Sequence, residues 1–217
     1  MSVHLTRALE ALKKSLLNVA ALAEEQVQKG VKALTEKDLE LAEEVSRRDS
    51  ELDQMEVELE EECLKILALH QPVAFDLRLV VAVLKINNDL ERIGDLARNM
   101  AERCSTLIGL DASLYPFDYG PMADKTVDML RLSIDSLIKQ DVNLAHAVLE
   151  ADRDVDDLHR KHYQDVKDSI LANPDRAQVL IEFLSISRYL ERVADLATNI
   201  AEDVIYLVDG KIVRHIY

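Results

Sequence analysis

The sequence predicts an all-α protein made of two tandem, pseudo-symmetric three-helix bundles, with six long helices in all. Turn-forming residues are scarce, with five Gly and four Pro in 217 residues, whereas an all-β fold needs turn residues at roughly ten-residue intervals. Apolar residues recur at helical spacing between these few breaks. Stretches of the first half return in the second half, which is typical of a duplicated unit.

The few Gly and Pro residues mark the ends of the helices. Pro72 and Pro174 lie at expected chain reversals, while Gly109, Pro116 and Gly120 fall in or beside a segment that lacks helical periodicity. The six predicted helices span residues 3–34, 38–69, 74–108, 121–139, 141–172 and 175–208. The predicted domains are a first repeat over 1–109, a linker over 110–120, and a second repeat with a short C-terminal tail over 121–217.

The second predicted helix shows its buried face most plainly. Val45, Leu52, Leu59 and Ile66 recur every seven residues, and Met55 adds a position between them. An apolar stripe of this kind packs against neighbouring helices rather than standing alone in water. We interpret these residues as core.

The third and sixth predicted helices carry the clearest repeat. Leu90–Glu102 returns as Leu190–Glu202 at an offset of 100 residues, with nine of the thirteen positions identical. Earlier in the unit the offset is 103, so that Asp38 corresponds to Asp141. Packing alone explains duplicated core positions, but duplicated polar positions need another reason.

The duplicated polar residues form one stripe in each half. Because a helix advances about 100° per residue, Glu91, Asp95, Asn99 and Glu102 share one side of the third helix, opposite its apolar side. The second copy of this stripe consists of Glu191, Asp195, Asn199 and Glu202. The middle helix of each half adds a further stripe, made of Asp49, Asp53, Glu56 and Glu60 in the first half and of Asp152, Asp156, His159 and Tyr163 in the second.

Like charges four residues apart on a helix repel by a few tenths of a kcal/mol. Hard cations reverse this cost, because they bind carboxylate oxygens and bridge neighbouring groups. The predicted metal ligands are Glu91, Asp95, Glu191, Asp195, Asp49, Asp53, Asp152 and Asp156, with Asn99, Glu102, Asn199, Glu202 and His159 as auxiliary ligands. The alternative is an exposed polar face that pairs with Arg92, Arg98 or Arg192, and the sequence leaves both interpretations open.

The histidines and cysteines are expected in the core or at the rim of a stripe, and not in a catalytic site. A ferritin-type di-iron centre uses two Glu-x-x-His motifs, and this sequence has none. His159 is therefore expected at the rim of a stripe, and His162 falls on the core seam. Cys63 and Cys104 align with valines of the second half, as small buried hydrophobes do.

Charge and motifs exclude several functions. The net charge of −15 repels phosphate backbones and argues against nucleic-acid binding. The sequence lacks a Gly-rich phosphate loop, a nucleophile elbow and a dinucleotide fingerprint, so we expect no enzymatic activity. The arginines beside the acidic stripes are too few and too balanced to predict a phosphate-binding patch.

The expected location is cytoplasmic. No apolar run approaches the roughly 20 residues needed to span a bilayer, and Lys13 and Lys14 interrupt the place where a signal peptide would have its apolar core. Two cysteines suit a reducing compartment. We expect membrane association only through partners.

The sequence resembles the PhoU family of bacterial phosphate-signalling regulators over essentially its whole length. The segments that carry the resemblance are His70–Arg78, Leu84–Asp95, Ser187–Glu202 and Val208–His215. The resemblance implies two three-helix bundles and a repeated Glu/Asp-x-x-x-Asp motif, which some members use to hold surface metal ions, including multinuclear iron clusters. That motif falls on Glu91 and Asp95, and on Glu191 and Asp195, while the acidic pairs of the middle helices fall on Asp49, Asp53, Asp152 and Asp156.

The resemblance also implies a function. Such a protein would repress phosphate uptake and phosphate-starvation signalling as an adaptor between the ATPase subunit of a phosphate ABC transporter and a sensor histidine kinase, and it would form a homodimer. Bound metal would be iron, zinc, magnesium or manganese. The alternatives are an accessory regulator of a low-affinity phosphate permease and a carboxylate-bridged metalloenzyme. The family pattern departs only slightly here, since His70 stands where Arg is expected.

Overall fold

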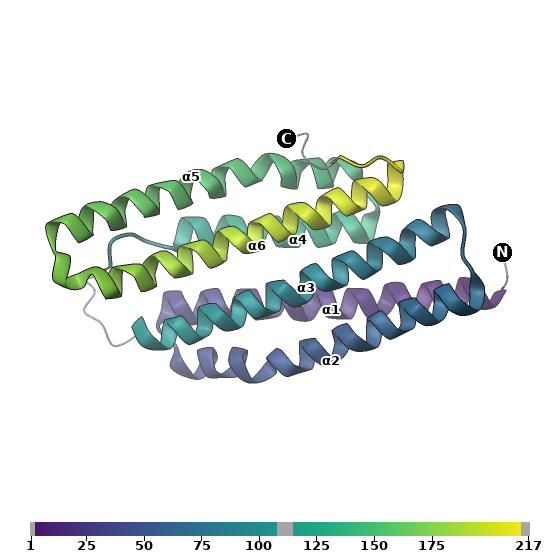
Figure 1. Ribbon diagram of the computed structural model, residues 1–217, viewed down its shortest axis with the longest axis horizontal. Coiled ribbons are helices and arrows are strands. Elements are labelled where there is room, and N and C mark those ends of the chain that lie inside the picture. Colours follow the sequence, from purple (N-terminus) through teal and green to yellow (C-terminus); the bar gives the residue numbers. More distant parts are fainter. Residues whose placement is uncertain (1–2, 108–114, 214–217) are drawn as a thin grey trace.

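Across residues 3–107 and 115–213, six long α-helices and one short 3-10 helix make up the fold. The computed structural model describes residues 3–107 and 115–213 (Figure 1). The elements are α1 (Val3–Glu36), α2 (Leu39–His70), α3 (Ala74–Leu107), α4 (Gly120–Lys139), α5 (Val142–Ala172), η2 (Pro174–Arg176) and α6 (Ala177–Asp209). The predicted all-α fold is confirmed, with helix ends within about two residues of those expected. Among the described residues, none of the helices is long and apolar enough to cross a membrane.

The helices form two three-helix units that lie side by side. One unit contains α1, α2 and α3, the other contains α4, α5 and α6, and α3 packs against α6 where the units meet (Figure 1). Two ion pairs cross this junction, Lys85 to Asp203 and Arg103 to Glu182, each at 2.8 Å. Because the earlier residue of α3 pairs with the later residue of α6, the two helices run antiparallel.

The middle helices begin with duplicated caps. Asp38 accepts a hydrogen bond from the Leu41 backbone N–H at 3.1 Å, and Asp141 accepts one from the Asn143 N–H at 2.8 Å. A carboxylate at this position satisfies a backbone donor that would otherwise lack a partner. The duplication therefore includes the signals that start α2 and α5.

The core runs continuously through both units. The predicted seam of Val45, Leu52, Leu59 and Ile66 is buried, with at most 2% of any of these residues exposed. Cys63 joins this core, and burial raises the pKa of its thiol to about 12. It is therefore the small hydrophobe that its alignment with a valine suggested.

Helices α2 and α3 approach most closely at Gly94. A Cβ atom built on Gly94 would lie 2.0 Å from Cδ2 of Leu52, so a methyl group does not fit there without movement. In the second unit the corresponding residues are Ala194 and Val155, both fully buried. In each half, the larger residue of the pair lies on the middle helix (Leu52 or Val155) and the smaller one on the third helix (Gly94 or Ala194).

Part of the predicted linker is packed against the second unit. Residues 108–114 lie outside the described residues, but Tyr115, Phe117 and Tyr119 are described. The Tyr119 hydroxyl donates to the backbone carbonyl of Phe183 at 2.8 Å, and the Phe117 ring stacks on His162 with centroids 3.8 Å apart. These aromatic residues extend the core of the second unit.

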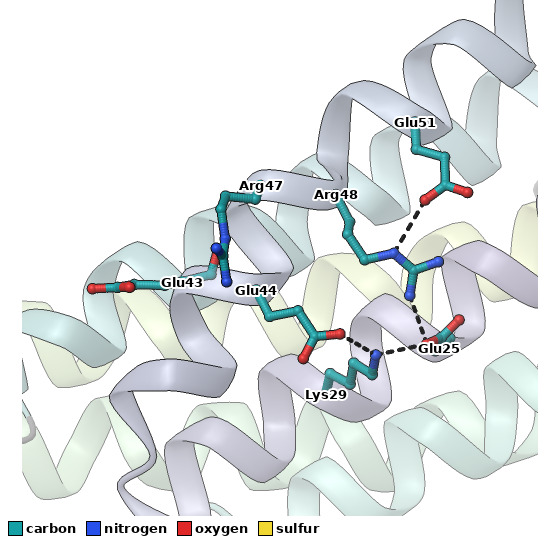
Figure 2. Close-up of polar contacts among 7 residues, drawn as sticks. All are labelled: Glu25, Lys29, Glu43, Glu44, Arg47, Arg48 and Glu51. Atoms are coloured by element: carbon teal, nitrogen blue, oxygen red, sulfur yellow. Dashed lines mark hydrogen bonds and ion pairs between the residues drawn. The ribbon is translucent and has the colours of Figure 1, made fainter.

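Ion pairs also join α1 to α2 (Figure 2). Arg48 of α2 contacts Glu25 of α1 at 2.7 Å and Glu51 of its own helix at 3.1 Å. Lys29 of α1 bridges Glu25 at 2.7 Å and Glu44 at 2.6 Å. Networks of partly exposed charges contribute little to stability individually, so their role is to fix how α1 lies along α2.

Candidate functional site

The acidic stripes of α2 and α3 face each other in the first unit. Burial raises the pKa of Glu91, and the nearby charges of Asp95, Asp53 and Glu56 raise it further. Asp49 is buried, and desolvation raises the pKa of its carboxyl as well. Carboxylates on two helices therefore share one electrostatic environment, as their positions in the sequence predicted.

Arg98 occupies the middle of the first-unit stripes. Its Nη1 forms an ion pair with Oδ2 of Asp49, its Nη2 lies 2.7 Å from Oδ1 of Asp95, and its Nε lies 3.9 Å from Oε1 of Glu102. The hydrogen bond from Arg98 opposes the rise that burial imposes on the pKa of Asp49. A guanidinium thus supplies positive charge to three of the predicted metal-binding side chains.

The second unit lacks this arginine. Thr198 stands at the position that corresponds to Arg98, and its hydroxyl donates to the backbone carbonyl of Asp195 at 2.7 Å. Burial raises the pKa of Asp152 to about 6, and the charges of Asp156 and Asp195 add to that rise. The pKa of Glu191 is also raised, first by burial and then by Asp195. Within the described residues, none of these four carboxylates forms an ion pair.

His159 lies beside the open carboxylates of the second unit. Its Nδ1 and that of His162 both lie 2.9 Å from Oγ of Ser187, whose hydroxyl points to Sδ of Met122 at 3.4 Å. One serine hydroxyl thus contacts both imidazole rings and a methionine sulfur. His162 is buried, as predicted for a core histidine. Burial lowers the pKa of both rings.

The other auxiliary candidates, apart from Glu102 beside Arg98, line cavities at the junction of the two units. Asn99 and Asn199 line a cavity between α3 and α6, and Glu202 lines two smaller cavities further along that junction. In residues 3–107 and 115–213, no group of three or more His, Cys, Asp or Glu side chains is placed so that it could hold a metal ion. The stripes are near each other, but their carboxylates do not converge on one point.

Sequence reasoning missed the cavity at the junction. It has a volume of about 600 Å³, and its lining includes Arg92 from α3 together with Arg188 and Arg192 from α6. Arg92 and Arg192 are equivalent residues of the two repeats. The duplication of this arginine in the two repeats could have drawn attention to it in the sequence. That both copies line one cavity, however, follows only from the packing of α3 on α6.

Comparison with known proteins gives consistent matches over nearly the whole chain. A PhoU domain family model matches residues 16–104 and 120–204. The chain is 37% identical over 214 residues to the "Phosphate-specific transport system accessory protein PhoU homolog" of Aquifex aeolicus, which covers 98% of this chain and 96% of that relative.

Two solved structures are similar to the fold described above. The crystal structure of PhoU from Pseudomonas aeruginosa matches with a TM-score of 0.90 and 35% identity, over 95% of this chain and 99% of that chain. The phosphate transport system regulatory protein PhoU from Streptococcus pneumoniae matches with a TM-score of 0.82 and 27% identity, over 96% of this chain and 98% of that chain.

Proposed function

Because this chain belongs to the PhoU family, we propose that it is an accessory protein of the phosphate-specific transport system and a negative regulator of phosphate uptake. One observation carries this proposal: the similarity to relatives of that description extends over both repeats and nearly every residue of the chain. The family is one of transport accessory proteins, which agrees with the expectation that the chain is not an enzyme.

The finer proposal is an adaptor role. When phosphate is plentiful, the protein holds a sensor histidine kinase in its repressing state and restrains the ATPase subunit of the phosphate transporter, in the cytoplasm and as a homodimer. The net charge of −15 supports electrostatic attraction to basic patches on such partners, and contacts of that kind weaken as salt rises.

Deletion of the gene in phosphate-rich medium tests the regulatory role. We expect phosphate-starvation genes to be expressed although phosphate is abundant, because the repressing state of the kinase is lost. Complementation with the intact gene is the control. Silence of those genes in the deletion strain would overturn the regulatory proposal.

We further propose that the acidic stripes hold metal ions, first of all in the second unit. The support is the open set of Asp152, Asp156, Glu191 and Asp195, with the ring of His159 within electrostatic range of Asp156. Burial raises the pKa values of Asp152, Glu191 and Asp195, and repulsion by neighbouring carboxylates adds to the rise; a hard cation there would bridge these groups and relieve the repulsion. Carboxylate oxygens suit magnesium and manganese, and an imidazole ligand beside them suits zinc and iron.

Elemental composition tests the metal sites. We expect the metal content of the purified protein to drop when Glu91, Asp95, Glu191 and Asp195 are changed together to Ala. The matched control changes four exposed acids far from the stripes, Glu10, Glu40, Asp128 and Asp175, to Ala. Unchanged metal stoichiometry in the first variant would remove the assignment.

A further inference from the structure

The cavity between α3 and α6 has the residues of an anion site. Arg92 reaches it from the first unit, whereas Arg188 and Arg192 reach it from the second. Arg188 and Arg192 are four residues apart and therefore lie on the same side of α6. The volume of about 600 Å³ falls within the usual size of small-molecule sites. We propose that this cavity binds an oxyanion of the phosphate class, held by Arg92, Arg188 and Arg192.

The three arginines leave their positive charges without direct partners. Within the part of the chain that the structure describes, none of them forms an ion pair within 4 Å, although the charge of Arg92 acts on Glu91 at longer range and the charges of Arg188 and Arg192 act on Glu191. Arg98 and Arg103, by contrast, are both ion-paired. Grouping three unpaired guanidinium groups around one space costs free energy by repulsion, and a bound anion would remove that cost.

Two carboxylates also reach the cavity wall. Asp95 is already paired with Arg98 at 2.7 Å, so its charge is taken up outside the cavity. Asp195 belongs to the second-unit stripe: burial raises the pKa of its carboxyl, and the charge of Arg192 opposes that rise without a direct ion pair. The lining therefore keeps an excess of positive charge in a protein whose total charge is strongly negative.

Neutral donors complete the lining. Tyr189 contributes a phenolic hydroxyl to the lining, and a hydroxyl can donate a hydrogen bond to an anion. Asn99 and Asn199 contribute amide groups, and no hydrogen bond among the described residues engages either side chain. Guanidinium forks with additional N–H and O–H donors match the several oxygens of a phosphate group.

The anion is a free phosphate ion or the phosphoryl group of a nucleotide. Isothermal titration calorimetry of the full chain with inorganic phosphate and, separately, with ATP distinguishes these sources, and acetate serves as a carboxylate probe. Stronger binding of phosphate than of ATP identifies the free ion, and the reverse identifies a nucleotide. This inference goes beyond the proposed function and depends neither on the metal sites nor on the regulatory role.

The deciding variant is Arg188→Gln with Arg192→Gln. Each arginine should account for about a tenfold loss of affinity, since charge-assisted hydrogen bonds are among the stronger polar contacts. Arg7→Gln with Arg47→Gln removes the same charge from exposed positions on α1 and α2 and should leave binding unchanged. Circular dichroism confirms that both variants fold.

Three results would overturn the proposal. The first is the absence of any binding of phosphate or ATP at millimolar concentration. The second is equal affinity in the two double variants. The third is binding of acetate as tight as that of phosphate. The last result would assign the cavity to a carboxylate instead. Failure here would leave the gene-deletion result unaffected, so this inference and the proposed function can fail separately.

Discussion

Replacing Gly94 by Ala should destabilise the protein, and a second change on α2 should cancel the loss. The Cβ atom that this substitution adds would lie 2.0 Å from Cδ2 of Leu52, which is itself fully buried. The second unit has Ala194 where the first has Gly94, and Val155 where the first has Leu52. The two halves thus distribute similar volume differently between the facing helices.

The magnitudes follow from packing and helix propensity. Overpacking a core by one methyl group costs about 2 kcal/mol, and Ala gains about 1 kcal/mol over Gly within a helix, so Gly94→Ala should lose about 1 kcal/mol. Leu52→Val removes one methylene and should also lose about 1 kcal/mol. In the double variant the new methyl fills the vacated space, and we expect stability near that of the wild type.

Urea unfolding followed by circular dichroism measures these differences through a double-mutant cycle. The expected coupling free energy between the two positions is about 2 kcal/mol, which lies in the range seen for residues in contact. Ala194→Gly is the matched control, because it removes a methyl group from the equivalent position without relieving a clash and should only destabilise. Additive losses in the double variant would show that α2 and α3 do not approach closely at this point.

Three further predictions concern charge and protonation. Arg98→Thr should lower the free energy of unfolding by about 2 kcal/mol in metal-free protein, because the buried Asp49 loses its ion pair. The same variant should bind more metal in elemental analysis, because the guanidinium no longer supplies positive charge to the carboxylates. An unchanged metal content would contradict the idea that Arg98 takes the place of a cation in the first unit. His162 has a pKa lowered to about 4 by burial, so the unfolded state binds more protons between about pH 6.5 and 4. The contribution of His162 to stability should therefore fall by about 3 kcal/mol as pH drops through that window, so the urea midpoint of the wild type should fall more steeply than that of His162→Phe; parallel profiles would contradict the prediction. Cys63 and Cys104, whose pKa values burial raises to about 12 and about 11, should react with a thiol reagent only after urea unfolds the chain; labelling of the native protein would contradict their burial.

The fold could be predicted because its signals are local. Pro72 and Pro174 fall at the turns, and Asp38 and Asp141 start α2 and α5 through caps that involve neighbouring residues. Helical periodicity then decides which face is buried. The packed stretch that contains Phe117 was not foreseen, since Pro and Gly nearby are typical of loops whether or not a loop's aromatic residues join a core.

The candidate site was only partly predictable. That the acidic stripes would face each other follows from periodicity and duplication. The ion pair between Arg98 and Asp49 does not follow from the sequence, because a long arginine side chain has several acidic residues within reach on neighbouring turns. The cavity lined by Arg92 and Arg192 depends on how α3 packs against α6, and no pattern within one repeat specifies the contact between repeats.

The two halves differ in whether an arginine forms ion pairs with their clustered acidic residues. Each unit gathers acidic residues on two facing helices, and such a cluster needs positive charge to be stable. In the first unit the protein supplies that charge itself, through Arg98 on Asp49 and Asp95. In the second, Thr198 leaves the corresponding acids unpaired, and Asp152 keeps a pKa of about 6. The difference at one position therefore agrees with the proposal that a cation binds in the second unit, whereas in the first unit the guanidinium of Arg98 supplies the positive charge.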